Sequence, residues 1–356
     1  MTPADWPKAR GARSNPKPRF DRLERDSCDD GWDLDEDSPA PPGTTIHIDK
    51  AKSVITRNTS PDIPFDRSIN PYRGCAHGCV YCFARPSHAY LDLSPGLDFE
   101  TQLFIKPDAP RLLEAELRKP GYRPAPIAIG TNTDPYQPIE REHRIMRGCL
   151  EVLAAFNHPV TITTKSHLVT RDIDILAPMA AKGLAAVAVS VTTLDRDLHR
   201  KLEPRAATPA KRLEAIRQLA AAGIPTMVMA APVIPRINDH ELEAILAAAK
   251  EAGAQNAAYT LLRLPYEVKD LFAEWLQAHF PDRAEHVLSL VAQQRDGKLY
   301  SSTFGTRYSG AGPHAELLAQ RVRIAQKKLG LDGSRLPLDV SQFKPPPAVG
   351  DQMSLF

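Results

Sequence analysis

Residues 68–87 read SINPYRGCAHGCVYCFARPS, and both the fold and the chemistry of the chain can be predicted outward from this segment. It contains three of the five cysteines, Cys75, Cys79 and Cys82, in the spacing C-x3-C-x2-C. Thiolates a few residues apart can converge on one face of a metal site, and iron–sulfur clusters are normally held by cysteine thiolates. A 4Fe–4S cluster has four irons, so three cysteines leave one iron open to a substrate or cofactor.

Two other roles for these cysteines are compatible with the residues alone. A zinc site needs a fourth ligand, which His77 could supply, but zinc ligands usually come as two separated pairs and no second pair exists. A disulfide would leave one of the three thiols unpaired, and the N-terminus lacks the apolar region of a secretory signal. Cluster ligation therefore accounts best for the motif.

The motif resembles that of the radical S-adenosylmethionine (SAM) superfamily, whose members carry C-x3-C-x-aromatic-C. Tyr81 is the aromatic residue before the last cysteine here. The resemblance implies a partial (β/α)6 barrel with a 4Fe–4S cluster at its C-terminal edge. It also implies that the open iron binds the amino and carboxylate groups of SAM. One electron, supplied by a reductant such as flavodoxin or ferredoxin, then releases a 5′-deoxyadenosyl radical.

Short apolar runs alternate with helical patterns from about residue 50 onward, which favours a parallel sheet built from βα units. An extended piece at 102–106 and a helix at 111–118 follow the cysteine segment. Further strands are predicted at 127–130, 160–164, 185–191, 226–231 and 258–262, and helices at 140–156, 171–182, 209–222 and 239–252. Helices at 266–279 and 283–293 and a strand-like stretch at 298–304 come after them.

Length and composition suit one large α/β domain with a sizeable core. The chain has 356 residues, of which 42% are hydrophobic, and its formal net charge of +2 says little about partners. No run of about 18 apolar residues exists, so no membrane span is expected. We therefore expect a cytoplasmic protein, a location that suits an oxygen-sensitive cluster.

The chain divides into four predicted segments. Residues 1–50 form a disordered tail whose basic first half could contact nucleic-acid phosphates and whose second half is acidic. The core domain spans residues 51–300. A C-terminal extension, residues 301–344, contains a helix near 314–329, and a proline-rich tail occupies residues 345–356.

Polar residues that follow the predicted strands are candidates for the SAM pocket, because active sites of α/β folds gather at the carboxyl ends of strands. Arg205 could clamp the methionine carboxylate, although an ion pair with Glu203 is an alternative. Asp134 could equally begin a turn, because Pro135 follows it. The candidate cofactor-binding residues are Tyr81, Thr131, Thr133, Asp134, Lys165, Ser190 and Arg205.

The segments TNTDPYQP, TTKS and VSV resemble the branch of the superfamily related to spore photoproduct lyase, often described as DNA repair photolyase-like. This resemblance covers roughly residues 50–330 and implies action on nucleic acid in DNA repair or modification. The lyase uses a cysteine as hydrogen donor just before the segment that matches 131–134, and this chain has none there. Cys149 is expected to lie buried in a helix. The competing interpretation is a cluster- or zinc-containing DNA-associated binding module without radical chemistry.

The last five residues resemble the short peptide by which bacterial repair and replication proteins dock on the sliding clamp. Leu355 and Phe356 are adjacent apolar anchors, Met353 adds an adaptable contact, and Gln352 supplies a donor and an acceptor. The preceding prolines would act as a stiff spacer. The alternative is that the two anchors pack back onto the surface of their own domain.

Overall fold

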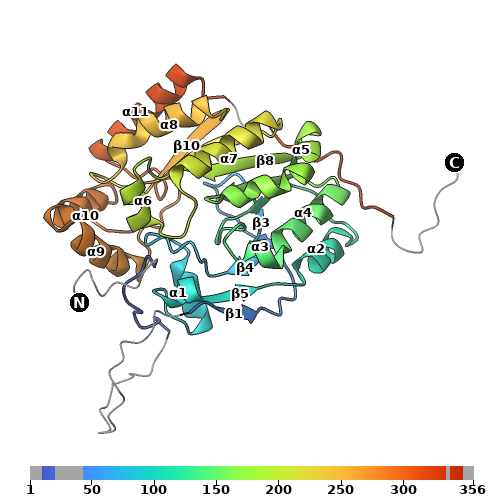
Figure 1. Ribbon diagram of the computed structural model, residues 1–356, viewed down its shortest axis with the longest axis horizontal. Helices are drawn as coiled ribbons and strands as arrows, with labels where there is room; N and C mark the ends of the chain where they lie inside the picture. Colours follow the sequence, from blue (N-terminus) through green and yellow to red (C-terminus); the bar gives the residue numbers. More distant parts are fainter. Residues whose placement is uncertain (1–9, 21–42, 334–336, 348–356) are drawn as a thin grey trace, which may run out of the picture.

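One seven-stranded, largely parallel sheet forms the centre of the fold (Figure 1). The computed structural model of the chain describes residues 10–20, 43–333 and 337–347. The strand order is β10-β9-β8-β7-β6-β3-β2, and neighbouring strands are parallel except for the edge pair β2 and β3. The strands are Thr56–Arg57 (β2), Arg67–Ile69 (β3), Ile127–Ile129 (β6), Val160–Thr164 (β7), Ala185–Ser190 (β8), Thr226–Val233 (β9) and Asn256–Leu261 (β10).

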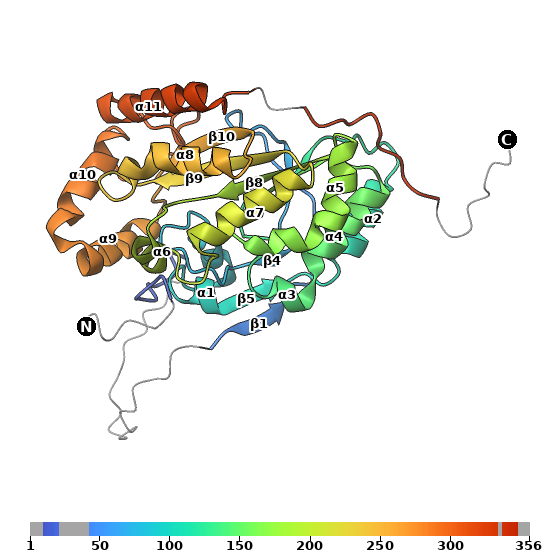
Figure 2. The same cartoon turned by 45° about the horizontal axis from the view of Figure 1, so that its top comes forward.

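Helices connect the parallel strands and cover one face of the sheet. α4, α5, α7 and α8 lie side by side along that face (Figure 2). Strand β6 is buried along its whole length and β8 along most of it, as expected for parallel strands that are covered on both faces. The connecting helices are Ala109–Leu117 (α2), Glu140–His143 (α3), Ile145–Ala155 (α4), Ile173–Ala181 (α5), Arg196–Leu202 (α6), Pro209–Ala221 (α7) and Leu242–Glu251 (α8).

The α/β fold of repeated βα units that the sequence predicts is confirmed. The parallel strands from β3 to β10 follow one another in chain order, as a partial (β/α)6 barrel requires. The strand predicted at 160–164 coincides with β7. Within the described ranges no pairing joins β10 to β2, so the barrel stays open.

The helix predicted over 140–156 is divided into α3 and α4. Arg144 lies between them with a left-handed φ of 50°. The Glu140 carboxylate accepts hydrogen bonds from the backbone N–H groups of Met146 (3.0 Å) and Arg147 (3.3 Å). Glu140 thereby satisfies free N–H groups in the first turn of α4, a role that hydrophobic periodicity does not reveal.

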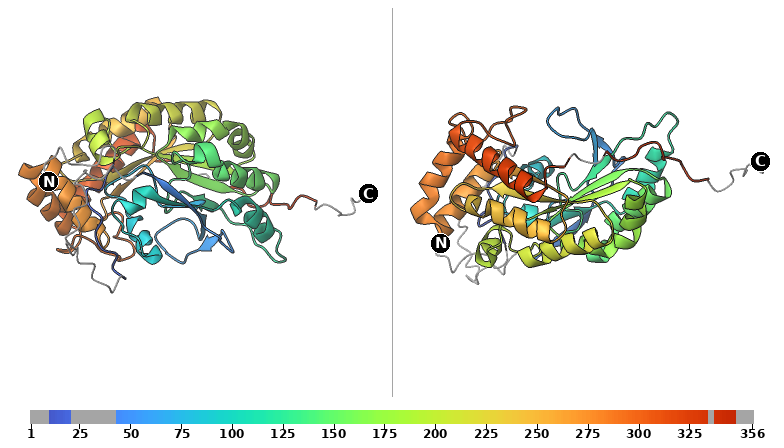
Figure 3. Two further views of the ribbon diagram at one scale, coloured as in Figure 1. Left: turned by 60° about the horizontal axis from the view of Figure 1, so that its bottom comes forward. Right: turned by 90° about the horizontal axis from the view of Figure 1, so that it is seen from above.

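A second, three-stranded sheet lies on the side of the main sheet opposite to these helices (Figure 3). Its order is β1-β5-β4, and β5 is the extended piece predicted at 102–106. Because β4 leads from β3 to the cysteines, this sheet directs the chain away from the main sheet. Its strands are Thr45–Ile48 (β1), Tyr72–Arg73 (β4) and Gln102–Ile105 (β5), accompanied by the short helices Arg85–Leu91 (η2) and Asp98–Thr101 (α1).

The C-terminal part contributes three helices that pack on the barrel. They are Val268–His279 (α9), Ala284–Gln293 (α10) and Pro313–Leu329 (α11), and α11 lies against α8. Trp275 of α9 belongs to a hydrophobic cluster that also contains Tyr81, so this part packs directly against the cysteine segment. The strand predicted at 298–304 is wrong: those residues form turns and irregular backbone, and Ser301 Oγ accepts a local hydrogen bond from Thr303 N–H (3.2 Å).

The N-terminal segment 10–20 differs from the disordered tail predicted for residues 1–50. The N–H groups of Gly11 (3.0 Å) and Ala12 (2.8 Å) donate to the buried Glu100 carboxylate, and Ala12 is 1% exposed. These distant contacts order a segment whose composition alone is typical of disorder. Residues 43–50 are also described and include β1, whereas residues 1–9 and 21–42, with Cys28, lie outside the described residues.

The end of the described chain runs over the C-terminal ends of α2 and α4. Arg118, directly after α2, donates to the Pro346 carbonyl (2.8 Å), and Lys344 N–H donates to the carbonyl of Phe156, directly after α4 (3.0 Å). The clamp-like residues Gln352, Met353, Leu355 and Phe356 lie outside the described residues. Among the helices that the structure describes, none is both long enough and apolar enough to cross a bilayer.

Candidate metal centre at the cysteine loop

The cysteine loop, residues 74–82, begins where β3 and β4 end, at the carboxyl edge of the parallel sheet. Ligand sites of α/β folds form at this edge, so the loop lies where the sequence predicts. Its conformation depends on close backbone approaches. Gly78 has a φ of 68°, and a Cβ there would lie 2.7 Å from the Glu100 carboxylate. A side chain at this position would therefore be strained in backbone and in space.

Buried polar side chains fasten the loop to its surroundings. The fully buried Gln137 accepts from Ala76 N–H (2.8 Å) and donates to the Gly74 carbonyl (3.1 Å). Arg85 donates to the Cys79 carbonyl (3.0 Å) and forms an ion pair with Glu100, and both side chains of that pair are fully buried. These contacts satisfy backbone groups that an irregular buried loop would otherwise leave unpaired. These contacts therefore fasten the loop at its beginning and in its middle.

The three loop thiols are suited to a cluster. Cys75 and Cys79 are buried, Cys82 is half-buried, and none of the described cysteines forms a disulfide. Burial raises the pKa of the Cys79 and Cys82 thiols, so metal binding would have to displace their protons. A set of thiols without carboxylate ligands matches the donors that iron–sulfur clusters use.

A single zinc ion fits the loop less well. Over the residues that the structure describes, no group of three His, Cys, Asp or Glu side chains is arranged to hold one ion. Cysteines of a cluster bind different irons and so stand farther apart than the ligands of one ion. His77, the possible fourth zinc ligand, instead lies with its Nδ1 3.4 Å from an Asp134 carboxylate oxygen.

Asp134 joins the loops that follow β3, β6 and β7. Its carboxylate accepts from Thr164 Oγ1 (2.7 Å) and from the N–H groups of Lys165 (2.7 Å) and Tyr136 (2.9 Å), besides contacting His77. Burial alone would raise the pKa of Asp134, but the His77 ring and these donors lower it to about 2. Burial alone would lower the pKa of His77, but Asp134 and Cys75 together raise it to about 10.

Lys165, which follows β7, lies close to Tyr81 of the cysteine loop. The Lys165 ammonium is 5.9 Å from the centroid of the Tyr81 ring. Burial lowers the pKa of Lys165, but the nearby Cys79 and Glu203 outweigh it and leave that pKa raised. None of the described residues accepts a side-chain hydrogen bond or ion pair from Lys165, so its charge is available to a ligand.

A buried network links Tyr81 to the strands of the sheet. The Tyr81 hydroxyl donates to the Glu203 carboxylate, which also accepts from Thr192 Oγ1 (2.7 Å) and forms an ion pair with Arg212. Burial would raise the pKa of Glu203, but Arg212 and Lys165 lower it to about 2. Arg212 also donates to the Ser190 carbonyl (3.1 Å). The network holds the aromatic residue of the motif in place.

Three other predicted residues, Thr131, Thr133 and Ser190, lie at the ends of β6 and β8 and are at least half-buried. Thr131 Oγ1 accepts from Asn70 (3.2 Å), and Thr133 Oγ1 donates to the Tyr72 carbonyl (3.1 Å). Ser190 is 4% exposed at the end of β8. Thr133 and Ser190 are buried and Thr131 is half-buried.

Arg205 reaches the loop through its backbone, because its N–H donates to the His77 carbonyl (3.2 Å). The ion pair between Arg205 and Glu203, the alternative from the sequence, is not formed, since Glu203 pairs with Arg212 instead. The positioning roles of Gln137, Arg212 and the Arg85–Glu100 pair are not predicted from the sequence. Of these residues, only Gln137 could have been suspected from the sequence, because it lies in the polar segment that follows β6.

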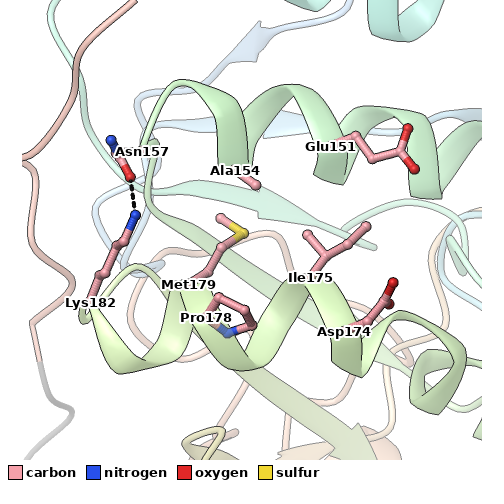
Figure 4. A pocket seen from close by; sticks show the side chains of 8 residues that line it. All are labelled: Glu151, Ala154, Asn157, Asp174, Ile175, Pro178, Met179 and Lys182. Carbon is pink, nitrogen blue, oxygen red and sulfur yellow. Dashed lines mark hydrogen bonds between the residues drawn. The ribbon is translucent and has the colours of Figure 1, made fainter. Parts of the chain in front are cut away.

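A groove between α4 and α5 is unrelated to this centre (Figure 4). It is lined by Ala154, Ile175 and Met179, and Lys182 donates to the Asn157 side chain at 2.9 Å across one end. Asn157 precedes β7 and Lys182 precedes β8, so this end lies at the amino edge of the sheet. The cysteine loop lies at the carboxyl edge.

Known proteins match the same part of the chain. The family model of the radical SAM superfamily matches residues 69–249. The uncharacterized protein Rv2578c of Mycobacterium tuberculosis is 39% identical over 303 residues, which cover 83% of this chain and 84% of the relative. The uncharacterized protein MJ0683 of Methanocaldococcus jannaschii is 25% identical, over 69% of this chain and 88% of the relative.

Solved structures share the fold. Spore photoproduct lyase complexed with dinucleoside spore photoproduct matches with a TM-score of 0.58 and 16% identity, over 80% of this chain and 78% of that one. A mutant of the same lyase with bound AdoMet and dinucleoside spore photoproduct matches with a TM-score of 0.56, 15% identity and the same coverage. At this identity the likeness concerns the fold.

Proposed function

This chain belongs to the radical SAM superfamily, and on that premise we propose that its three loop cysteines hold a 4Fe–4S cluster at which SAM binds. The observation that carries the proposal is the set of three thiols free of disulfides, the buried Cys75 and Cys79 and the half-buried Cys82, at the carboxyl edge of the sheet. When bound, the cluster would supply the single electron that cleaves SAM to a 5′-deoxyadenosyl radical.

The residues around the loop have distinct roles in this proposal. The Lys165 ammonium lies near the Tyr81 ring of the loop, where it can meet the carboxylate of SAM or a ribose oxygen. Gln137 holds the loop by accepting a hydrogen bond from the Ala76 N–H, and Asp134 accepts one from the N–H of neighbouring Lys165. Burial of these groups keeps water away from a reactive radical, which would otherwise be quenched.

We propose nucleic acid as the substrate, in DNA repair or modification. Support comes from the fold, which is shared with a lyase that was solved with a dinucleoside spore photoproduct. The thiol-dependent lyase reaction is not part of the proposal. Cys149, the one described cysteine outside the loop, is fully buried in α4 and belongs to the main hydrophobic core, so it cannot reach a substrate.

The test is anaerobic reconstitution with iron and sulfide, followed by dithionite and SAM. Wild-type protein should form 5′-deoxyadenosine, whereas Cys75→Ala, Cys79→Ala and Cys82→Ala should lose both the cluster absorbance and the product. Cys149→Ala is the matched control and should keep both, because it lies outside the loop.

The alternative function, a cluster- or zinc-containing DNA-associated binding module, predicts a different outcome. Such a protein would bind metal without forming 5′-deoxyadenosine. Full iron loading of the Cys82→Ala protein would contradict the ligand assignment, and a loaded wild type without 5′-deoxyadenosine would contradict the radical chemistry.

We further propose that the C-terminal peptide binds a sliding clamp. Phe343 packs against Tyr122 and His158, with ring centroids 5.4 Å and 5.5 Å apart, so the described chain is held to the domain just before the tail. An anchored base with a proline-rich spacer would present Leu355 and Phe356 away from the barrel. Tethering of this kind would raise the concentration of the enzyme near DNA.

Titration of purified clamp with wild-type protein and with protein lacking residues 352–356 tests this proposal. Wild type should bind and the truncated protein should not, because the two apolar anchors carry most of the binding energy. Absence of wild-type binding at about 50 μM, or equal binding by both proteins, would show that the tail has another role.

A further inference from the structure

Aromatic and guanidinium side chains form a patch directly beside the cysteine loop. Phe83 follows Cys82 and is 48% exposed. The guanidinium carbon of Arg263 lies 5.3 Å from the Phe83 ring centroid, 4.7 Å from that of Tyr308 and 5.9 Å from that of Tyr300. Arg263 follows β10, so the patch also lies at the carboxyl edge of the sheet.

The patch continues over the irregular segment between α10 and α11. The guanidinium carbon of Arg307 lies 4.8 Å from the Tyr308 ring centroid and 4.9 Å from that of Phe304. Phe304 is 55% exposed, so much of its side chain faces solvent despite the nearby Arg307 guanidinium. We call the set Phe83, Arg263, Tyr300, Phe304 and Tyr308 the aromatic–arginine patch.

The charge of the patch is not balanced within the described residues. Arg307 is paired with Asp62 (2.6 Å), but Arg263 has no carboxylate partner there and its Nε is buried without a hydrogen bond. Arg295, 2% exposed, donates only to the carbonyls of Leu262 (2.6 Å) and Arg307 (3.0 Å). Burial and the nearby Arg263 lower the pKa of Arg295 to about 10. Two adjacent cations without an acid attract an anion.

Exposed aromatic faces and an unbalanced guanidinium together specify the chemistry of the ligand. Nucleobases stack on aromatic side chains, and the phosphates that link them pair with arginine. In a duplex the base faces are stacked on one another and cannot reach a protein ring, whereas unpaired bases can. An acidic peptide would satisfy the arginine but would leave the aromatic faces uncovered.

We infer that the aromatic–arginine patch binds unpaired nucleotides and presents them to the cysteine loop. The inference rests on the proposed function, which makes nucleic acid the substrate, and adds that the strand is unpaired where it meets the enzyme. Phe83 belongs to the patch and directly follows Cys82, the last proposed cluster ligand, so the patch and the cysteine loop are neighbours in the chain. A base stacked on this ring lies beside the centre where SAM is cleaved.

The experiment measures binding of fluorescent oligonucleotides to the full-length, reconstituted protein under anaerobic conditions. The probes are a single-stranded oligodeoxynucleotide, the same sequence as oligoribonucleotide, and the DNA duplex. Wild type should bind a single strand more tightly than the duplex. Comparison of the single-stranded DNA with the RNA of the same sequence shows whether the protein prefers deoxyribose or ribose. Phe83→Ala and Phe304→Ala should each weaken single-strand binding about tenfold, as is usual when a stacking ring is removed.

Arg263→Gln should weaken single-strand binding. It should also make the plot of log K against log salt shallower by about 0.7, because one phosphate contact is lost. Phe304→Tyr should restore binding, since it keeps the ring. Arg111→Gln is the matched control, because that exposed arginine lies on α2 and pairs with Asp108. Iron content should equal that of wild type in every variant.

Dithionite-driven 5′-deoxyadenosine formation without nucleic acid separates the two ideas. If this product forms but the variants bind single strands as wild type does, or duplex is preferred, the patch inference is wrong while the proposed function stands. If no product forms from loaded wild type, the proposed function fails whatever the binding data show.

Discussion

Asp134 and Lys165 are neighbours in the site but use their side chains in opposite ways. The roughly four acceptor positions of the Asp134 carboxylate are all filled by protein groups, so it has none left for the SAM ammonium. Lys165 makes its protein hydrogen bond through its backbone and keeps its ammonium for a ligand. Both residues are polar and follow strands, but only the Lys165 side chain has no protein partner among the described residues and can bind the cofactor.

Lys165→Ala should weaken SAM binding by about 1–3 kcal/mol, because a charged hydrogen bond to the ligand is lost. The cluster spectrum should remain, since the Lys165 side chain is not one of the proposed cluster ligands and makes no hydrogen bond to the loop among the described residues. Anaerobic calorimetry of the reconstituted protein measures the affinity. Lys182→Ala, which removes a lysine at the amino edge of the sheet, is the control. An unchanged affinity in Lys165→Ala would place this side chain outside the pocket.

Asp134→Ala should act differently from Lys165→Ala. It leaves His77 without its anionic partner and frees the N–H of Lys165, so the loop loses its attachment to β7. We expect lower thermal stability of the apoprotein and reduced iron loading, measured by calorimetry and iron assay. Normal iron loading with normal thermal stability would show that this attachment is dispensable.

At the scale of the element, the segment 10–20 acts as a strap across the cysteine loop. A Cβ on Gly11 would lie 1.7 Å from the Gly78 carbonyl oxygen, so the strap and the loop touch along their backbones. The strap also reaches α9, because Ser14 Oγ donates to Glu274 (2.8 Å) and Arg19 pairs with Glu267 (3.1 Å). It therefore joins the cluster loop to the C-terminal helices.

Gly11→Val should displace the strap from the loop, because the new side chain collides with backbone that cannot move away. We expect a loss of about 1–3 kcal/mol of stability and faster removal of iron by a chelator, followed by absorbance. Gly43→Val is the matched control, since a Cβ at Gly43 meets nothing within 4 Å. Equal chelation rates in the two variants would argue against the strap.

The two largest of the three hydrophobic clusters among the described residues organise the molecule. The larger one fills the space between the sheet and its helices, and the smaller one joins α9 and α10 to Cys79, Val80 and Tyr81 of the loop. The C-terminal segment closes the larger cluster from outside, where Phe343 packs on it next to His158. Stability of the whole chain is thus coupled to groups far from the site.

His158 should make the stability of the protein depend on pH. Its ring is fully buried, with Nδ1 donating to the Pro159 carbonyl (3.0 Å) and Nε2 accepting from the Tyr122 hydroxyl (2.8 Å). Burial lowers its pKa from the reference value of 6.5 to about 4, so the folded state binds fewer protons than the unfolded state between these values. The stability that the neutral ring contributes is present above pH 6.5 and lost as pH falls toward 4.

Urea unfolding of wild type and His158→Gln at pH 7 and pH 4.5 tests this dependence. The decrease in unfolding free energy over that interval should be about 2 kcal/mol smaller in the variant, which has no titrating ring at this position. An identical decrease in both proteins would mean that His158 keeps an ordinary protonation equilibrium in the folded state.

The chemistry and the order of the βα units follow from local patterns in this sequence. The spacing of Cys75, Cys79 and Cys82 and the alternation of apolar runs describe residues close together in the chain, so they can be interpreted without a fold. For this reason the strand at 160–164 and the cysteine loop at the carboxyl edge are predicted correctly. The strand predicted at 298–304 is wrong, because an extended pattern forms a strand only where another strand pairs with it, and none does so among the described residues.

The partners of the site residues depend on contacts between distant parts of the chain. Glu203 pairs with Arg212 across a turn and not with nearby Arg205, and it holds Tyr81 from 122 positions away. Gly11 meets the loop through Glu100, 89 positions along the chain. No spacing rule encodes such pairs, because which donor reaches a buried carboxylate is settled only when the sheet, the helices and the strap pack together.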